Sequence, residues 1–143
     1  AHADFAWRGD TLSGVYWFFA SPLIVYIVIY GVCKQGELRG VDLATGERLL
    51  ETFAPTTGAR PAGCATAFLV KNEDRYFLFN EKGDLIIAKL TPDGYDELSR
   101  CHLLEPTNEA WGRTVLWSHP AFAYRHVFAR NDEELVCADL SAR

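Results

Sequence analysis

The chain has 143 residues, of which 49% are hydrophobic, and this predicts one domain with an ample packed core. Its net charge of -5 and its scattered Lys and Arg residues exclude the electrostatic footprint of a protein that binds nucleic acid or an anionic membrane. Because the sequence starts at Ala1 and has no Met, we expect a processed chain or a piece of a longer protein.

The most apolar stretch, residues 15–33, is long enough to be considered as a membrane-spanning helix. Ser21-Pro22 interrupts it, and its β-branched and aromatic residues favour strands over a helix. The stretch also aligns with the soluble segment 119–129. We therefore predict two buried strands here and no membrane span.

Alternating hydrophobic residues and turn signals predict strands throughout the chain, with little helix. The expected strands cover residues 23–25, 28–32, 37–42, 47–52, 66–70, 75–80, 84–90, 95–103, 120–123, 126–130 and 133–140. Gly-containing turns separate many of them, since Gly accepts a positive φ without strain. Two longer connections, at 54–63 and 105–113, divide the strands into three groups.

The three groups repeat one another. The segment at residues 38–43 returns at 85–90 and again at 135–140, with offsets of 47 and 50 residues. A period of this length built from short strands is typical of β-propeller blades. We expect an all-β fold with about three four-stranded antiparallel blades in an incomplete ring: blade one at about 15–52, blade two at about 64–103 and blade three at about 115–143, the last without its fourth strand. Residues 1–14 would complete a preceding blade.

The turn Asp42-Leu43-Ala44-Thr45-Gly46 resembles the repeat of the pyrroloquinoline-quinone-like (PQQ-like) β-propeller family. That repeat has Asp, two residues, Thr-Gly, three residues and a Trp. Asp42, Thr45 and Gly46 match the pattern, whereas Leu50 replaces the Trp that packs between blades in the family. The resemblance implies the C-terminal part of such a propeller and a location in a periplasm or outside the cell.

The same resemblance implies either a quinoprotein dehydrogenase, which binds PQQ and calcium in the central funnel, or a non-catalytic scaffold. The dehydrogenases carry adjacent cysteines near the quinone, and this chain has none. Its candidate calcium ligands are Asp10, Asp42, Asp84 and Asp139, but Asp is common beside turns in any case. We predict no cofactor, metal or catalytic residue, and keep PQQ with calcium as the alternative.

The four cysteines, Cys33, Cys64, Cys101 and Cys137, lack the spacing of a metal site. We expect buried small residues on strands. One or two disulfides are the alternative for an exported protein.

Two groups of residues are candidates for a binding surface. Tyr26 and Ile27 occupy a hairpin tip where Asn-Gly is favoured, so they are expected, together with Tyr16 and Trp17, to face a partner, another copy of the chain or the rest of a ring. The alternative is that these residues fold onto the adjacent connection. Trp111, Arg113, Trp117 and His119 are expected to meet at one face of the ring. Ser118 and His119 are adjacent and point to opposite faces of a strand, so they do not form a catalytic pair.

These features favour a non-enzymatic β-propeller scaffold that binds a protein partner or further copies of itself. A fragment of a quinoprotein dehydrogenase is one alternative. A second alternative is an engineered or excised propeller fragment whose property is self-assembly, suggested by the missing Met, the incomplete ring and the apolar hairpin tip.

Overall fold

The structure is a computed structural model and describes residues 22–141. In this range the chain is all-β, as predicted, and its strands form four antiparallel sheets. The predicted segment 1–14 and the start of blade one lie outside the described residues.

The first sheet has the order β1-β2-β3-β4, the second β5-β6-β7-β8 and the third β11-β12-β13, while β9 and β10 form a separate hairpin. The strands are β1 (Leu23–Val25), β2 (Val28–Val32), β3 (Leu38–Asp42), β4 (Arg48–Thr52), β5 (Ala67–Asn72), β6 (Arg75–Asn80), β7 (Asp84–Thr91), β8 (Gly94–His102), β9 (Asn108–Ala110), β10 (Arg113–Val115), β11 (Ala121–Ala123), β12 (His126–Arg130) and β13 (Leu135–Asp139). We call the three larger sheets blades one, two and three.

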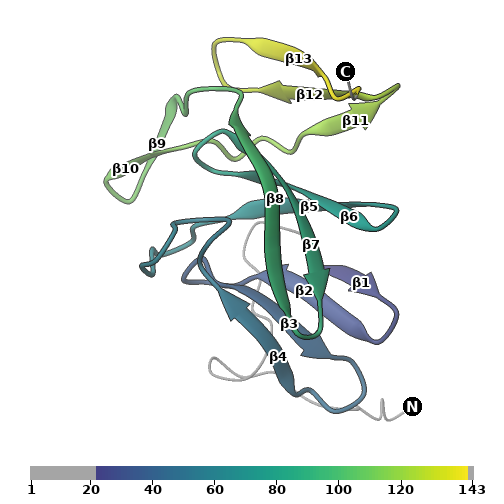
Figure 1. The fold of residues 1–143 in the computed structure, drawn as a ribbon. Helices are drawn as coiled ribbons and strands as arrows, with labels where there is room; N and C mark the ends of the chain where they lie inside the picture. The colour runs from purple at the N-terminus through teal and green to yellow at the C-terminus, as the bar shows by residue number, and fades with distance from the viewer. Residues whose placement is uncertain (1–21, 142–143) are drawn as a thin grey trace, which may run out of the picture.

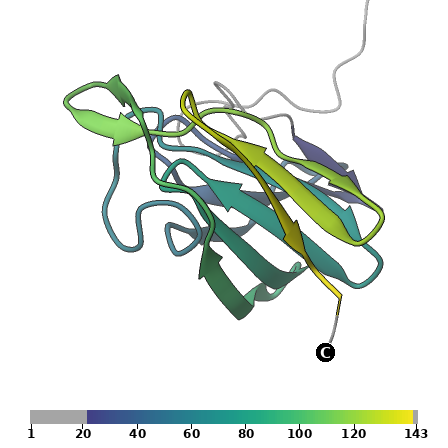
Figure 2. The ribbon, with the colours of Figure 1, turned by 90° about the horizontal axis from the view of Figure 1, so that it is seen from above.

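The blades are stacked in chain order, with blade two in the middle (Figure 1). Seen from above, β11 to β13 lie over the strands of blade two (Figure 2). Within residues 22–141 the three blades do not close a ring. The arrangement is consistent with consecutive propeller blades, and blade two has one face toward blade one and the other toward blade three.

The inner strands β6 and β7 of blade two are buried on both faces, because successive side chains of a strand point to opposite sides and each side meets a neighbouring blade. In β6, Leu78 packs in the core shared with blade one, and Phe79 packs in the core shared with blade three. In β7, Ile86 likewise packs in the core shared with blade one, and Leu85 packs in the core shared with blade three. This explains why β6 and β7 contain nearly continuous apolar runs, whereas the outer strand β8 is polar and exposed.

The turn that carries the family resemblance is built by its polar residues. Asp42 Oδ1 accepts hydrogen bonds from the backbone amides of Ala44 and Thr45, at 2.9 and 2.8 Å, and from the Thr45 hydroxyl at 3.0 Å. The hydrogen bonds from Thr45 lower the pKa of the Asp42 carboxyl. Gly46 follows with a φ of 75°, and Leu50 packs beside the core between blades one and two.

The connection expected at residues 105–113 is not a plain loop. It contains β9 and the start of β10, which pair antiparallel across a turn at Trp111 and Gly112. Each strand has only three residues, so neither offers enough alternation to be read from the sequence. Val115, expected in blade three, therefore belongs to this hairpin.

The prediction of buried cysteines on strands is wrong in part. Cys33 and Cys64 are buried but lie outside the strands, whereas Cys101 on β8 and Cys137 on β13 are exposed. The reason is position in the sheet, since β8 and β13 are the last strands of their blades. All four thiols are free.

Residues 22–141 contain no helix long and apolar enough to cross a membrane. The described part of the apolar stretch, from Pro22 to Cys33, forms β1 and β2, as predicted. Only β2 is buried; the prediction that β1 is buried too is wrong, since β1 is the edge strand of its sheet and Ile24 is 58% exposed.

Candidate functional site

The first hairpins of the three blades end on the same side of the molecule, at the right of Figure 1. Each has a two-residue turn, and the first turn residue has a left-handed backbone in all three: φ is 54° at Tyr26, 54° at Glu73 and 49° at Tyr124. Tyr26 and Tyr124 are 93% and 96% exposed. We call the surface formed by Tyr26, Ile27, Tyr124 and Arg125 the hairpin-tip face.

The aromatic residues on this face are held in a costly conformation. A left-handed backbone is disfavoured for residues with a large side chain, and Asn or Gly is the usual choice in such turns. At Arg125 φ is also positive, at 62°, so blade three has two such residues in succession. Ile27, beside Tyr26, is exposed as well.

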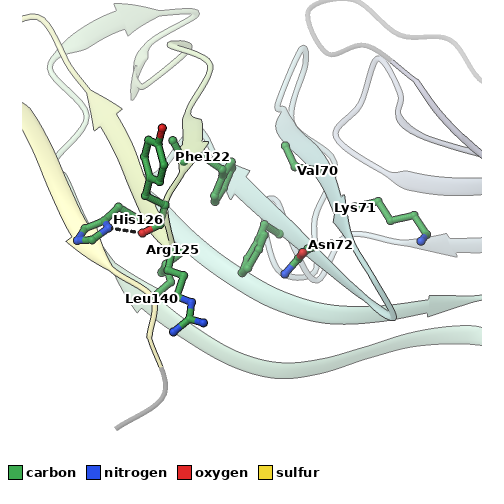
Figure 3. A pocket seen from close by; sticks show the side chains of 10 residues that line it. Val70, Lys71, Asn72, Phe122, Arg125, His126 and Leu140 are labelled. Carbon is green, nitrogen blue, oxygen red and sulfur yellow. Dashed lines mark hydrogen bonds between the residues drawn. The ribbon is translucent and has the colours of Figure 1, made fainter.

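Between blades two and three, on the same side, lies a cleft of about 360 Å³ (Figure 3). Phe77 of β6 and Phe122 of β11 stack in it, with ring centroids 4.9 Å apart and planes inclined by 16°. The other lining residues are Val70, Lys71, Asn72, Ala123, Tyr124, Arg125, His126 and Leu140. We call this the Phe77–Phe122 cleft.

Three basic residues, Lys71, Arg125 and His126, are among those that line the cleft, but the Lys71 side chain points away from it (Figure 3). Lys71 Nζ donates a hydrogen bond to the backbone carbonyl of Glu73 at 2.6 Å, and His126 Nδ1 lies 2.7 Å from the backbone carbonyl of Tyr124. Asp139 is the neighbouring acid; hydrogen bonds from Ser141 chiefly lower the pKa of its carboxyl, and His126 and Arg125 add to the effect.

The structure brings together three of the four residues expected at the second surface. The rings of Trp111 and Trp117 have centroids 5.5 Å apart, and the guanidinium carbon of Arg113 lies 5.9 Å from the centroid of the Trp111 ring. Trp111 is exposed at the tip of the β9–β10 hairpin, with a φ of 49°.

Arg113 and Trp117 are anchored to Glu81, a buried residue in the turn between β6 and β7. Arg113 Nε donates to Glu81 Oε1 at 2.8 Å, and its NH2 group donates to Oε2 at 3.2 Å. The indole nitrogen of Trp117 donates to Oε2 at 3.1 Å, and Arg113 also donates to the carbonyl of Gly63. Because these hydrogen bonds fix Arg113, it serves to hold the β9–β10 hairpin against blade two.

His119 lies apart from this group, before β11 begins at Ala121. Its ring packs against Phe68 with centroids 4.7 Å apart, and Nδ1 lies 2.8 Å from the carbonyl of Pro120. A smaller cavity of about 170 Å³ lies beside Trp117 and Ser118.

A polar network that the sequence did not reveal crosses β7 and β8. Arg100 donates to Asp84, to Glu97 and to the carbonyl of Ala54, at 2.9, 2.9 and 3.1 Å. His102 Nδ1 lies 3.1 Å from Asp84 Oδ1. Burial raises the pKa of Asp84, but hydrogen bonds from His102, Asn80 and Arg100 outweigh it, so the pKa is lowered. The network ties the outer strand of blade two to the connection that precedes the blade.

The described candidates for calcium ligands do not fit a common site. Asp42, Asp84 and Asp139 lie on different blades, and each makes the local hydrogen bonds given above. Within the described part of the chain, no three His, Cys, Asp or Glu residues are grouped so as to hold a metal ion. Asp10 lies outside that part.

Sequence reasoning missed Phe77 and Phe122 as residues that meet in a cleft. Phe77 and Phe122 read as ordinary strand residues, and only the docking of two blades brings them together. Tyr124-Arg125 was recognisable as an unusual turn, because Tyr124 repeats Tyr26 at the same place in its blade.

No model of a known protein family matches the sequence, and a comparison with curated proteins found no match.

Proposed function

We propose that this chain is a non-enzymatic β-propeller scaffold with PQQ-like repeats, and that it binds a protein partner through the hairpin-tip face. Exposure of Tyr26 and Tyr124 at equivalent turns with left-handed backbones is the observation that carries the proposal. Such strain is commonly kept where function requires a particular side chain. Exposed Tyr residues are also enriched in binding surfaces, since they bury a large area at a low cost in conformational entropy.

The proposed location, a periplasm or the cell exterior, rests on the resemblance of the turn from Asp42 to Gly46. The chemistry of the hairpin-tip face suits a protein partner, because exposed Tyr26, Ile27 and Tyr124 present apolar surface together with hydroxyl groups.

The test uses two variants with the same change in different blades. The first replaces the blade-one tip (Tyr26→Asn with Ile27→Gly), and the matched control replaces the blade-two tip (Glu73→Asn with Asp74→Gly). Affinity capture from the organism of origin, quantified by mass spectrometry, should recover a partner with the wild type and the control but not with the first variant. Equal recovery with both variants would exclude the hairpin-tip face as the binding surface.

A specific observation also favours binding of further copies of the chain. Leu38 and Leu85 occupy equivalent positions in β3 and β7 and are 0% and 2% exposed, whereas the corresponding Leu135 in β13 is 68% exposed. Among the described residues, β13 pairs only with β12, so its outer edge offers unpaired backbone groups. An edge of this kind can add a strand from another chain.

Light scattering over a range of protein concentrations tests this second proposal. The wild type should show a mass that rises with concentration toward a defined oligomer. Leu135→Lys should remain a monomer, because a charged residue on an edge strand opposes pairing. A wild type that stays monomeric at all concentrations, or a variant that assembles equally, would contradict it.

A further inference from the structure

We propose that the outer edge of β13 binds an extended, basic segment of a partner protein, which adds to blade three as a fourth antiparallel strand. The proposal rests on the scaffold role proposed above and names the chemistry of the strand that this edge accepts. It is separate from the hairpin-tip face, because β13 meets the added strand through its backbone.

The other two blades show what the third strand of a blade holds on its outer side. β3 and β7 each pair there with a fourth strand, β4 or β8, which runs antiparallel. Both pairs have their register irregularity at the same place, between Gly40 and Val41 in β3 and between Ile87 and Ala88 in β7. β13 repeats the pattern of these strands, but within the described residues it pairs with β12 alone.

The ladder between β12 and β13 shows which backbone groups face outward. The amide of Leu140 donates to the carbonyl of Arg125, and the carbonyl of Glu134 accepts from the amide of Asn131. In an antiparallel pair, successive residues of a strand bond to opposite sides. Three residues of β13 therefore direct their amide and carbonyl groups away from β12: Leu135, Cys137 and Asp139.

Blade one shows such an outward amide in use. Asp42 of β3 corresponds to Asp139 of β13, and its amide donates to the carbonyl of Glu47, just before β4, at 2.9 Å. In β13 the same row of groups is a template for a strand of another chain.

Charged residues that face each other across the third and fourth strands have opposite signs. Arg39 of β3 pairs with Glu51 of β4, with Nε and Oε2 2.8 Å apart, and Lys89 of β7 pairs with Asp96 of β8. Asp139 takes the place of Lys89 in blade three. By the same rule, the residue opposite Asp139 should be basic.

The other end of β13 gives the same result. Glu134 corresponds to Asp84 of β7, which pairs with His102 of β8 and forms a salt bridge with Arg100 at 2.9 Å. Glu134 is exposed, so a cation of the added strand can reach it.

The balance of charge around the edge also favours a basic segment. Residues 130–141 contain four acids and one base. Arg125 and His126 lie near Asp139 and partly balance it, whereas Glu133 and Glu134 are exposed at the opposite end. A second β13 strand would bring acids of its own to this edge, and like charges on facing strands are unfavourable.

Isothermal titration calorimetry on the full chain tests the proposal with a capped peptide, Lys-Thr-Thr-Val-Thr-Val-Arg. In the register of β7 and β8, its Lys faces Asp139 and its Arg faces Glu134. The acidic counterpart, Glu-Thr-Thr-Val-Thr-Val-Asp, should bind at least tenfold more weakly. Equal binding of the two peptides, or no binding of the basic peptide at millimolar concentration, would overturn the proposal.

Methylation of the peptide backbone separates strand addition from simple attraction of charges. The amide of the fourth residue faces Cys137 in this register, so its N-methylation should weaken binding at least tenfold. The amide of the fifth residue faces away, and its N-methylation is the matched control, which should change binding less than threefold. Equal effects of the two methyl groups would rule out a paired strand.

Exchanging the charges of the edge locates the site. The double variant Glu134→Lys with Asp139→Lys should bind the acidic peptide more tightly than the basic one. Asp93→Lys with Glu109→Lys, at exposed positions outside blade three, changes the net charge equally and should keep the preference of the wild type. If the double variant does not fold, Glu134→Lys alone should reduce the preference at least fivefold. An unchanged preference in a folded variant would refute the assignment.

Light scattering on the same samples distinguishes this proposal from binding of further copies. A wild type that binds the basic peptide as a monomer supports the basic segment and contradicts self-association. A wild type that assembles and binds neither peptide assigns the edge to further copies and overturns the basic segment.

Discussion

Single residues decide how the turns between strands pack against the connections. Gly83, in the turn between β6 and β7, has a φ of 83°, and a Cβ atom there would lie 1.7 Å from the carbonyl oxygen of Leu104. A side chain would therefore clash with a backbone atom that cannot rotate away. The turn fits against the connection after blade two only because this residue is Gly.

We expect Gly83→Ala to lower the free energy of unfolding by about 2 kcal/mol or more, since it adds both a clash and left-handed strain. Gly94→Ala is the matched control, because no atom lies within 4 Å of its added Cβ. Urea unfolding followed by circular dichroism measures both variants. Equal stability of the two would show that the backbone at Gly83 moves freely.

Asp84 makes the free energy of unfolding of the chain depend on pH. Its pKa is lowered below the ordinary value of 3.8, so its contribution to stability is present above that pH and is lost as the pH falls through the folded-state pKa. The free energy of unfolding of wild type should exceed that of Asp84→Asn near neutral pH, and the difference should shrink in acid. Urea unfolding at a series of pH values measures it, and a constant difference would contradict the prediction.

At the scale of elements, the strands were largely predictable. The predicted ranges 23–25, 28–32, 75–80 and 126–130 match β1, β2, β6 and β12 residue for residue. The other predicted strands differ at one or both ends by a residue or two, because turn residues extend or shorten the hydrogen-bonded ladder. The hairpin β9–β10 was not predicted, since its pairing depends on contacts with blade two.

The β11–β12 turn offers a test of strain at the same scale. Replacing its tip (Tyr124→Asn with Arg125→Gly) should raise the free energy of unfolding by about 1–2 kcal/mol, because Asn-Gly adopts positive φ at both positions with little cost. Urea unfolding followed by circular dichroism measures the gain. A variant no more stable than wild type would mean that the turn is not strained.

At the scale of the whole molecule, the blades are joined by hydrogen bonds that repeat. The backbone amide of Cys64 donates a hydrogen bond to the carbonyl of Lys34 at 2.6 Å. The backbone amide of Leu116 donates one to the carbonyl of Glu81 at 2.8 Å. Asn80 Nδ2 donates to the carbonyl of Pro55, and Asn131 Nδ2 repeats this bond with Glu105. Each connection is thereby held by the turn of a neighbouring blade.

The buried Glu81 tests this joining. We expect Glu81→Gln to lower the free energy of unfolding by about 2–3 kcal/mol, because it removes charge-assisted hydrogen bonds to Arg113 and Trp117. Glu109→Gln, an exposed residue on β9 of the same hairpin, should change it by less than about 0.5 kcal/mol. Thermal and urea unfolding measure both, and a similar loss in the two variants would contradict the anchoring role of Glu81.

The sequence by itself determined the all-β class, the repeat and most strands, because alternation and turn chemistry are local properties of the chain. It also marked Tyr26 and Tyr124 as unusual, since each breaks the preference of its own turn. Only the tertiary structure decided that Phe77 meets Phe122, that Glu81 holds Arg113 and that Leu135 is exposed. These contacts join residues far apart in the sequence, and they depend on how one blade docks against the next, which no local pattern records.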